Sequence, residues 1–396
     1  MKRILPAIVA IAASACSLAA GGKDLNRPCG WCTCASLDGG HYDMKGGKGK
    51  TVTLTGGCGD SREALEQAIM QNDVIILDGS KGPFVVSKTI TFENTAHKTI
   101  IGINAAQVRT MFETTDEIRA LIQAKVPSGL SSTSGGGTLS NGKILKEENA
   151  FRTRQALIDY TGDRDESYRN AGIFRFWSGC EDIIIRNIAF VGPGSMDIDG
   201  SHMIEFAFGA HHVWIDHCSF TDAQRTSLYF GRKSDFASVT WCTFDYTERS
   251  SDHRLASLIG GYDNPEMFGR DNLNVTFAGC HWGPGVEGRT PMVRFGNVHC
   301  VNCYYDCYGS TIDPRTDSEM RVENCYFESG VKPLARRVPG RLPAKAYEYV
   351  GNWSASGESF TSDGKVAMPY RIRIMPAEKV KRAVLKGAGP TLRNPM

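Results

Sequence analysis

Hydrophobic and polar residues alternate in several short segments of the chain, and in each one the alternation shifts part-way through. In Val213-x-Ile215-x-x-Cys218-x-Phe220 the apolar positions follow a period of two, change parity over one extra residue, and then resume that period. The same pattern recurs at 183–190, 237–244, 275–282, 298–305 and 320–327. An apolar period of two is typical of a strand with one buried face. The parity change therefore predicts a sharp corner between two short strands that face one core.

The corners repeat at intervals that suit a solenoid. Successive corners are 30, 24, 38, 23 and 22 residues apart, which predicts about 22 residues per turn and loops inserted into two of the turns. The predicted architecture is an all-β protein, a parallel β-helix. Stacking of its turns predicts one internal column of cysteines, followed by a second column of aromatic residues. The cysteines are Cys218, Cys242, Cys280, Cys303 and Cys325. Because Ile188 fills the same place in another turn, we expect apolar packing there and no disulfides.

The segments before residue 172 follow the rhythm less closely. Residues 23–60 are rich in Gly and Cys, and we expect them to cap the open end of the solenoid. A helix over Ser61–Gln71 is predicted, with Asp60 as its N-cap, followed by strands at Val74–Leu77 and Phe84–Val86. Residues 103–172 interrupt the pattern as an insertion, with a Ser/Gly-rich loop at 127–142 and a charged piece at 146–169.

The tail that begins at Val331 combines several prolines with basic residues, and we expect it to wrap the exterior of the solenoid. Those basic residues are Arg336, Arg337 and Arg341.

The first 20 residues resemble a secretory signal. A basic start, Met1-Lys2-Arg3, precedes a short apolar run and then small residues, with cleavage expected after Ala19 or Ala20. Residues 21–396 would then form a single domain. Two destinations stay open: a secreted or periplasmic protein, or one anchored at the cell surface by a lipid on Cys16. No later stretch approaches the roughly 18 apolar residues of a membrane span.

Composition narrows the functional classes. The chain has 396 residues, of which 41% are hydrophobic, so it can bury a large core. Its net charge of +2 comes from scattered residues, which gives no electrostatic footprint for nucleic acid. We expect a monomer. Cys29, Cys32 and Cys34 lack a second ligand pair at a zinc spacing, so an N-terminal disulfide is expected there, with Cys58 as a partner.

Residues 172–330 resemble polysaccharide lyase family 1, the pectate and pectin lyases. Four segments carry the resemblance: Val213-Trp214-Ile215-Asp216-His217-Cys218-Ser219-Phe220, Asp252-His253 leading to Leu258-Ile259-Gly260, Arg289-Thr290-Pro291-Met292-Val293-Arg294-Phe295-Gly296-Asn297-Val298-His299, and Ile183-Ile184-Ile185-Arg186-Asn187-Ile188. The resemblance implies a right-handed parallel β-helix with an N-terminal capping helix and long loop insertions. It also implies β-elimination on polygalacturonate or methylated pectin, in which a base removes the proton on C5 and the glycosidic bond at C4 breaks.

The resemblance assigns roles to two arginines. Arg289 matches the arginine proposed as the family's base, and Arg294 matches the one that binds a substrate carboxylate. An arginine is an unusual base because its guanidinium is normally protonated. We therefore expect such an enzyme to favour alkaline pH.

The usual calcium ligands of the family are replaced in this chain. Their positions fall on His202, Arg225 and Tyr229, and Arg with Tyr would repel or fail to coordinate calcium. We expect no cofactor, with Arg225 standing where pectin lyases place an arginine and binding the uronate directly. Asp197 and Asp199 leave a shifted metal site open as an alternative.

A second departure concerns the family's lysine, whose register falls on Leu255. Arg254 beside it is a candidate substrate-binding substitute, although its side chain would point to the opposite face of an extended strand.

Two other functions have to be compared with a lyase: a hydrolase and a protein that binds pectic chains without cleaving them. An inverting hydrolase on the same solenoid would need paired aspartates, and the sequence shows no Asp-Asp pair at the strand edges. A lyase-like protein that only binds pectic chains is a further alternative. The cues on methylation conflict, because Arg294 favours free carboxylates whereas lost calcium ligands favour esters. His217 and Asp216 are read as architectural residues that bond between turns.

Overall fold

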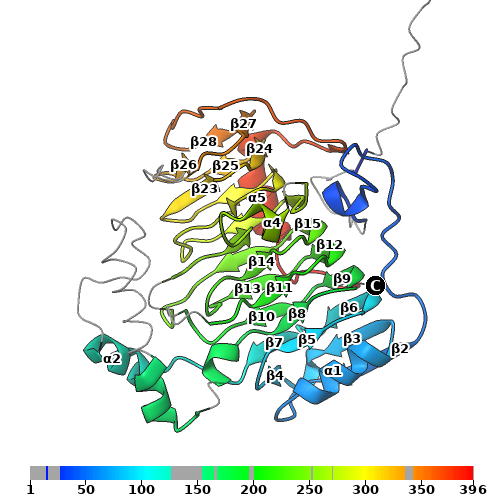
Figure 1. Ribbon diagram of the computed structural model, residues 1–396, viewed down its shortest axis with the longest axis vertical. Helices are drawn as coiled ribbons and strands as arrows, with labels where there is room; N and C mark the ends of the chain where they lie inside the picture. The colour runs from blue at the N-terminus through cyan, green and yellow to red at the C-terminus, as the bar shows by residue number, and fades with distance from the viewer. Residues whose placement is uncertain are drawn as a thin grey trace, which may run out of the picture.

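Three parallel sheets wind around one core in the computed structural model, which describes residues 15–16, 27–125, 154–164, 167–195, 200–250, 253–269, 271–334 and 342–395. Within these residues the sheets have ten, nine and eight strands, named sheets I, II and III here. The chain visits the sheets in turn, so each coil adds one strand to each sheet in parallel register. The coils stack along the vertical axis of Figure 1. The predicted right-handed parallel β-helix is confirmed.

The strands of each sheet are short and follow one another in chain order. Sheet I contains β2 Thr51–Thr55, β3 Val74–Asp78, β6 Ala96–Ile103, β9 Glu181–Arg186, β12 His211–Asp216, β15 Asp235–Thr240, β18 Val275–Ala278, β21 Asn297–Val301, β24 Glu319–Glu323 and β27 Ala346–Val350. Sheet II contains β4 Phe84–Val86, β7 Gln107–Thr110, β10 Ala189–Val191, β13 Ser219–Thr221, β16 Thr243–Asp245, β19 His281–Trp282, β22 Tyr304–Tyr305, β25 Tyr326–Phe327 and β28 Trp353–Ser354. Sheet III contains β5 Ile90–Phe92, β8 Phe174–Phe176, β11 Ile204–Phe206, β14 Leu228–Phe230, β17 Ser257–Ile259, β20 Met292–Val293, β23 Ser310–Pro314 and β26 Lys332–Leu334.

The predicted corners lie between sheets I and II. At each corner one residue adopts the left-handed region, with φ of +59° at Asn187, +52° at Asn302 and +47° at Asn324. Asparagine tolerates this region better than most residues. One residue in this conformation turns the chain sharply, and it accounts for the extra residue in the repeating pattern.

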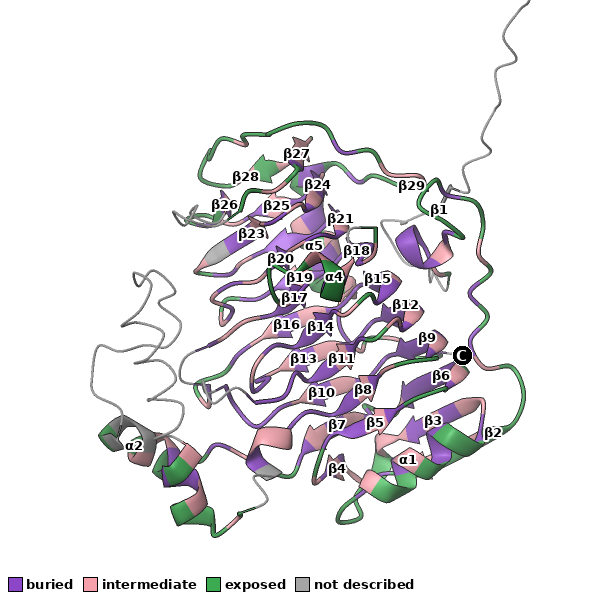
Figure 2. Ribbon diagram, in the orientation of Figure 1, coloured by how far each residue is buried: buried purple, intermediate pink, exposed green. Residues whose placement is uncertain are grey.

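The interior contains the two predicted columns. The five cysteines of the corner repeat are buried free thiols. The aromatic residues two positions after these cysteines, and after Ile188 in the equivalent place, stack on one another through six coils, with ring centroids 4.4 to 5.7 Å apart. This aromatic ladder consists of Phe190, Phe220, Phe244, Trp282, Tyr305 and Phe327. Figure 2 shows the strands mostly buried, whereas the outer side of α1 is exposed.

Helix α1, Arg62–Gln71, lies at the first coils and packs against β2, β3 and β5. It buries Leu65, Ala68 and Ile69 in the main core. The predicted cap is displaced by one residue: Ser61 holds the N-cap position without a side-chain hydrogen bond, while Asp60 Oδ1 accepts one from the Arg62 amide at 3.0 Å.

The Cys-rich segment lies elsewhere than expected. Residues 27–48 run along the outside of sheet I, where the short helix η1, Gly30–Thr33, contacts β12, β15 and β18. The Trp31 amide donates to Thr276 Oγ1 at 3.0 Å, and the Cys32 amide to Ser238 Oγ at 3.1 Å. Gly30 permits this approach, since a Cβ there would lie 2.4 Å from Thr276 Oγ1. For residues 27–48 the expectation of an end cap is wrong, whereas residues 51–55 form β2, the end strand of sheet I.

The predicted disulfide between Cys58 and the N-terminal cysteines is not formed in the part of the chain that the structure describes. Among the described cysteines, Cys34 and Cys58 carry no disulfide, and Cys58 is exposed. The Cys32 thiol donates a hydrogen bond to the Cys29 carbonyl oxygen at 3.4 Å.

The expected insertion begins later than residue 103. Residues 107–110 form β7, which pairs with β4 and β10 and so belongs to a regular coil. Helix α2, Asp116–Lys125, and a helical stretch over 154–161 form the described part of the insertion. The Ser/Gly-rich loop at 127–142 lies outside the described residues, as do Arg336, Arg337 and Arg341. No helix in the described part of the chain is long and apolar enough to cross a membrane.

The chain after Val331 first adds β26, β27 and β28 to the three sheets, so the predicted start of the exterior tail at Val331 is wrong. The last part of the tail does wrap the exterior. Residues 373–395, named the C-terminal strap, run back along the corners of earlier coils and include helix α5, Ala377–Gly387. Its backbone carbonyl oxygens accept hydrogen bonds from three corner asparagines: Arg373 from Asn302, Met375 from Asn324, and Leu392 from Asn187.

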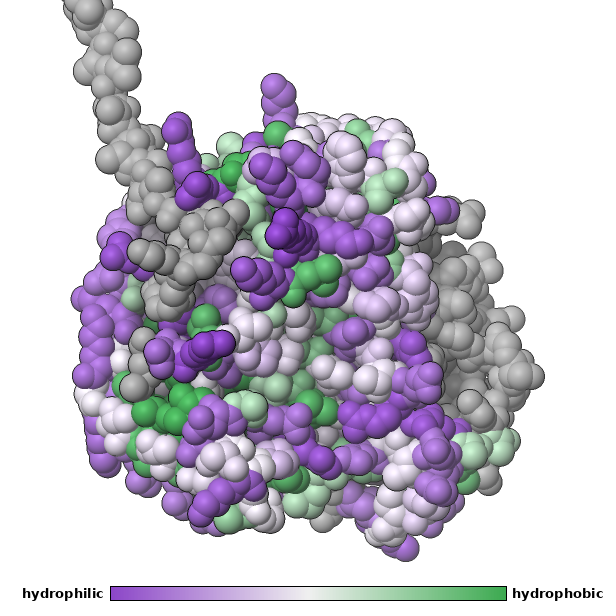
Figure 3. All heavy atoms as spheres, turned by 180° about the vertical axis from the view of Figure 1, so that it is seen from behind, coloured by the Kyte–Doolittle hydropathy of each residue, from purple (hydrophilic) through white to green (hydrophobic). Residues whose placement is uncertain are grey.

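The face of the molecule that is turned away in Figure 1 is mostly hydrophilic, with apolar residues in small separate areas (Figure 3).

The first 26 residues are described only at β1, Ala15–Cys16, which pairs with β29, Arg371–Ile372. The signal peptide therefore stays a prediction.

Candidate active site

Sheet III carries the side chains from which the candidate site is built. Its strands place an apolar residue inward, one side chain outward and another apolar residue inward, as in Phe174-Arg175-Phe176. The outward residues form a row across neighbouring strands in direct register: Thr91, Arg175, Glu205, Tyr229, Leu258, Met292 and Asp313. We call the side where these strands begin the leading edge of sheet III, and the side where they end the trailing edge.

Arg289 lies at the leading edge, just before β20. Its Nη1 donates to the hydroxyl of buried Thr226 at 2.9 Å. Its Nε is buried and makes no hydrogen bond to any described residue. Burial and the positive charges of Arg225, Arg294 and Arg315 lower the pKa of its guanidinium to about 9. An arginine in this setting holds its proton much less tightly than an exposed one.

His202 lies beside this cluster at the same edge. Its ring stacks on Tyr229, with centroids 4.3 Å apart and 13° between the planes. Burial and the charges of Arg225 and Arg289 hold the pKa of His202 well below its ordinary value, so the imidazole is neutral at neutral pH. Burial raises the pKa of Tyr229 to about 12, so its phenol stays protonated. Because His202 and Tyr229 are both uncharged, the charge around them is that of the neighbouring arginines.

The outward row contains the carboxylate of Glu205, between Arg175 and Tyr229 on the neighbouring strands. Glu205 is buried enough that its pKa is raised, with Arg175 acting in the opposite direction. Its Oε2 lies 3.6 Å from Arg175 Nε, and its Oε1 accepts a hydrogen bond from the Trp177 indole at 3.2 Å. Glu205 therefore fixes both side chains on the surface of sheet III.

Arg294 lies at the trailing edge, where it is already paired. Its Nε donates to Asp263 Oδ1 at 3.0 Å, and its Nη1 donates to the carbonyl oxygens of Gly260 and Gly261 at 3.2 and 3.3 Å. Burial and Arg315 lower the pKa of Arg294, whereas Asp263 opposes that shift. Asp263 thus offsets part of the positive charge that Arg294 would present to a ligand.

The structure brings Arg289, Arg225 and Arg294 close enough for their charges to interact, but it ties Arg254 to a loop. Both Nε and Nη2 of Arg254 donate to the Ser250 carbonyl oxygen, at 3.1 and 2.5 Å, and Arg254 also lies near Tyr308. Asp197 and Asp199, the alternative metal ligands, lie outside the described residues.

The donor set does not suit calcium. Calcium prefers several hard oxygen ligands, including carboxylates. The positions that the resemblance assigns to ligands hold an imidazole, a guanidinium and a protonated phenol, with Arg289 beside them. Within the described residues, no group of three or more His, Cys, Asp or Glu is arranged to hold a metal.

Comparison with known proteins decides the family. The pectate lyase family model matches residues 146–390, more than half of the chain. The chain belongs to the pectate lyase family. Within this family, pectate lyase A of Aspergillus niger is 29% identical over 218 residues, covering 54% of this chain and 63% of that protein. A pectate trisaccharide-lyase of Thermotoga maritima is 27% identical over 252 residues, covering 53% and 65%. The chain thus spans somewhat less than two thirds of the length of these pectate lyases.

A solved pectate lyase shares the fold over nearly the whole chain. The pectate lyase of Bacillus sp. N165, determined in complex with trigalacturonate, superposes with a TM-score of 0.61. The match covers 92% of this chain and 98% of that one, at 17% identity. At this identity the likeness establishes the fold of this pectate lyase family member, and its site must be argued from its own residues.

Two residues of the site carry a signal in the sequence that motif reading passes over. Arg175 and Glu205 each stand between two inward apolar residues of a sheet III strand. Their outward direction follows from the period of two. Asp263 and Thr226 carry no such signal, because their contacts with Arg294 and Arg289 join residues on different coils.

Proposed function

We propose that this protein cleaves pectic polysaccharide by β-elimination, with Arg289 as the base and without a calcium site. In this reaction the base takes the C5 proton, the C5–H electrons form the C4=C5 double bond, and the C4–O bond breaks. The leaving oxygen then acquires a proton. The products are one chain with a 4,5-unsaturated uronate end and one with a free hydroxyl.

One observation carries this proposal. Arg289 is a partly buried guanidinium surrounded by like charges, so its neutral form is far more accessible than that of an ordinary arginine. Arg289 needs a pKa below that of an ordinary arginine to act as a base, because only its neutral form can accept the C5 proton.

Arg225 is proposed to stabilise the negative charge that develops on the uronate carboxyl group. Positioned cations are effective where charge appears in the transition state. Arg225 lies close enough to Arg289 and His202 to lower both of their pKa values, so it stands beside the reacting atoms. Arg294, paired with Asp263, is proposed to bind a substrate carboxylate or ester at the trailing edge. The N-terminal pattern supports export, which would bring the protein to extracellular polymer.

The test follows the ultraviolet absorbance of the unsaturated product. Polygalacturonate and highly methylated pectin are each supplied with calcium and with excess chelator. We expect activity to survive chelation and to fall about 10²- to 10⁴-fold in Arg289→Lys, the range typical of a lost general base. Arg371→Lys is the matched control, because Arg371 is exposed on β29, which belongs to none of sheets I, II and III, and we expect it to keep most of the activity.

Three results would contradict the proposal. Activity that requires added calcium would point to a metal site. Full activity in Arg289→Lys would assign the base elsewhere. Retention of the protein on pectin without any product would favour a protein that binds pectic chains and does not cleave them.

A further inference from the structure

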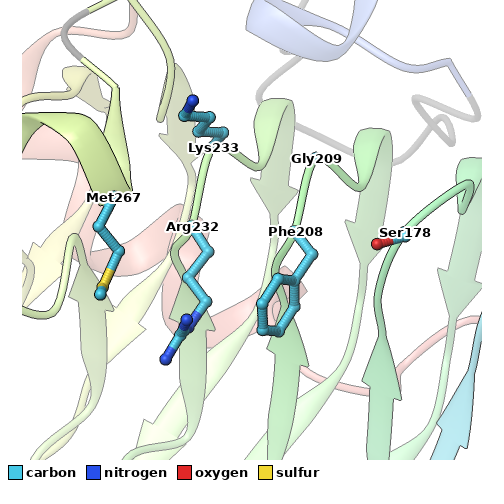
Figure 4. Close-up of a pocket in the computed structure, with 6 residues that line it drawn as sticks. All are labelled: Ser178, Phe208, Gly209, Arg232, Lys233 and Met267. Atoms are coloured by element: carbon cyan, nitrogen blue, oxygen red, sulfur yellow. The ribbon is translucent and has the colours of Figure 1, made fainter.

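A hollow of about 340 Å³ lies at the trailing edge of sheet III, away from Arg289. It is lined by Ser178, Phe208, Gly209, Arg232, Lys233 and Met267 (Figure 4). These residues follow β8, β11 and β14, and Met267 belongs to the short helix α4, Pro265–Phe268, after β17. Neighbouring strands are about 4.8 Å apart, so the hollow extends about 14 Å along the axis of the solenoid. We name it the Phe208 hollow.

An aromatic ring is held at the surface of this hollow. Phe208 remains 41% exposed, and the edge of Trp177 packs against it, with centroids 5.0 Å apart. The guanidinium of Arg232 lies 4.7 Å from the centroid of the Phe208 ring. Trp177 is itself fixed by the hydrogen bond from its indole to Glu205. The ring of Phe208 is therefore held in position while part of its surface stays open to a ligand.

The charge of the hollow is positive. Arg232 and Lys233 are the charged members of the described lining, which includes no carboxylate. Figure 4 shows Arg232 and Phe208 side by side on neighbouring coils. An aromatic ring can pack against the apolar face of a sugar ring, and a guanidinium pairs well with a carboxylate. A sugar that carries a carboxylate satisfies both groups.

We propose that the Phe208 hollow is a distal subsite for an acidic sugar residue, a uronate, of the polysaccharide strand that the candidate active site acts on. The inference rests on the proposed function for the identity of that strand. The hollow lies near the candidate site, because the charge of Arg232 is close enough to Glu205 and Tyr229 to oppose the rise in the pKa of each.

The separation of the two sites makes the subsite dependent on chain length. Phe208 follows β11 and Arg289 precedes β20, and β14 and β17 lie between them. Three strand spacings amount to about 14 Å along the axis alone, and the sites also lie at opposite edges of sheet III. A long polymer can contact both places, whereas a trisaccharide bound at Arg289 cannot fill both.

The test compares Phe208→Ala and Arg232→Gln with the wild-type protein. Trp353→Ala is the control, because Trp353 is 48% exposed on β28, in the last coil. Mobility in native gels containing polygalacturonate measures binding, and kcat/KM is measured on polygalacturonate and on trigalacturonate. We expect both variants to lose about tenfold in affinity for the polymer and in kcat/KM on it, which corresponds to about 1.4 kcal/mol. We expect kcat/KM on trigalacturonate, and every value for Trp353→Ala, to stay within about twofold of wild type.

The gel measurement separates this inference from the proposed function, since binding needs no cleavage. If the wild type cleaves polymer and the variants match it in both assays, the subsite is overturned and the lyase stands. If the wild type is retarded without cleaving and Phe208→Ala removes the retardation, the subsite stands and the lyase is overturned. Equal losses on trimer and polymer would overturn the subsite, and so would wild-type protein that the polymer does not retard.

Discussion

The chemistry of a single residue, Arg289, decides whether the site can work as a base. An exposed guanidinium keeps its proton above pH 12. Around Arg289, burial removes water that would stabilise the charged form, and three further arginines oppose it electrostatically. Only Thr226 is seen to accept a hydrogen bond from it among the described residues. The surroundings therefore favour loss of the proton.

This setting predicts a pH dependence. Because only neutral Arg289 accepts a proton, kcat/KM should rise about tenfold per pH unit below about pH 9 and level off above it, where Arg289 has lost its proton. Initial rates measured from pH 6 to pH 10.5, corrected for stability, check this directly. A maximum near neutral pH followed by a decline would contradict an arginine base.

At this scale the sequence allows roles to be proposed for single residues, but it does not show their partners. The resemblance assigns roles to Arg289, Arg294 and Arg225, because each is read within or near a contiguous motif, and these roles stay predictions. It could not show that Asp263 pairs with Arg294, since 31 residues separate them and the contact depends on how two coils stack. The same holds for Glu205 and Arg175, which meet only in the register of β8 and β11. Side-chain pairing between coils is a property of the folded register.

At the scale of elements, the aromatic ladder stabilises the stacking of coils. Phe220 is fully buried, and its ring stacks between Phe190 and Phe244 at 5.3 and 5.2 Å. Each coil thus contacts the next through a flat apolar surface as well as through strand hydrogen bonds. Loss of one ring leaves a cavity between two coils.

We expect Phe220→Ala to lower the free energy of unfolding by about 3–5 kcal/mol and Phe220→Leu by less, because leucine fills more of the cavity. Denaturant unfolding followed by tryptophan fluorescence measures the difference. Leu385→Ala serves as the control, since Leu385 is 56% exposed on α5, and we expect a change within about 0.5 kcal/mol. A small effect of Phe220→Ala would mean that the coils do not depend on the ladder.

Local elements were predictable, whereas docked segments were not. The corner pattern depends on residues a few positions apart, so the sequence shows it directly. The placement of residues 27–48 depends on Thr276 and Ser238, which are more than 200 residues away. Composition alone suggested an end cap, but backbone amides on this segment find acceptors on the outside of sheet I.

At the scale of the whole molecule, the C-terminal strap joins distant coils. Asn302 is fully buried, its Nδ2 donates to the Arg373 carbonyl oxygen at 3.0 Å, and its Oδ1 accepts from the Met375 amide at 2.9 Å. Farther along, the Leu392 amide donates to Asn187 Oδ1 at 3.0 Å, across 205 positions of sequence. The strap therefore spans corners of six coils, from that of Asn324 to that of Asn187.

Two substitutions at Asn302 separate the strap from the corner. Asn302→Gly keeps the φ of +52° without strain but removes both side-chain hydrogen bonds, so we expect faster proteolysis within 373–395. Asn302→Ala adds the backbone strain, and we expect it to be less stable than Asn302→Gly by about 1 kcal/mol. Limited proteolysis and thermal unfolding measure the two effects. Unchanged cleavage in both variants would show that the strap is held by other contacts.

The sealed column of cysteines determines how this molecule withstands an oxidising environment. Thiol–disulfide exchange needs a thiolate and access to it. Burial raises the pKa of the Cys242, Cys280 and Cys303 thiols well above the ordinary value, so the folded interior offers neither. A molecule whose coils separate would expose adjacent thiols together, and crosslinks between them would prevent the coils from closing again. Its lifetime under oxidation therefore depends on opening of the coils: on the equilibrium population of the open form where the coils reclose faster than the thiols oxidise, and on the opening rate where oxidation is faster.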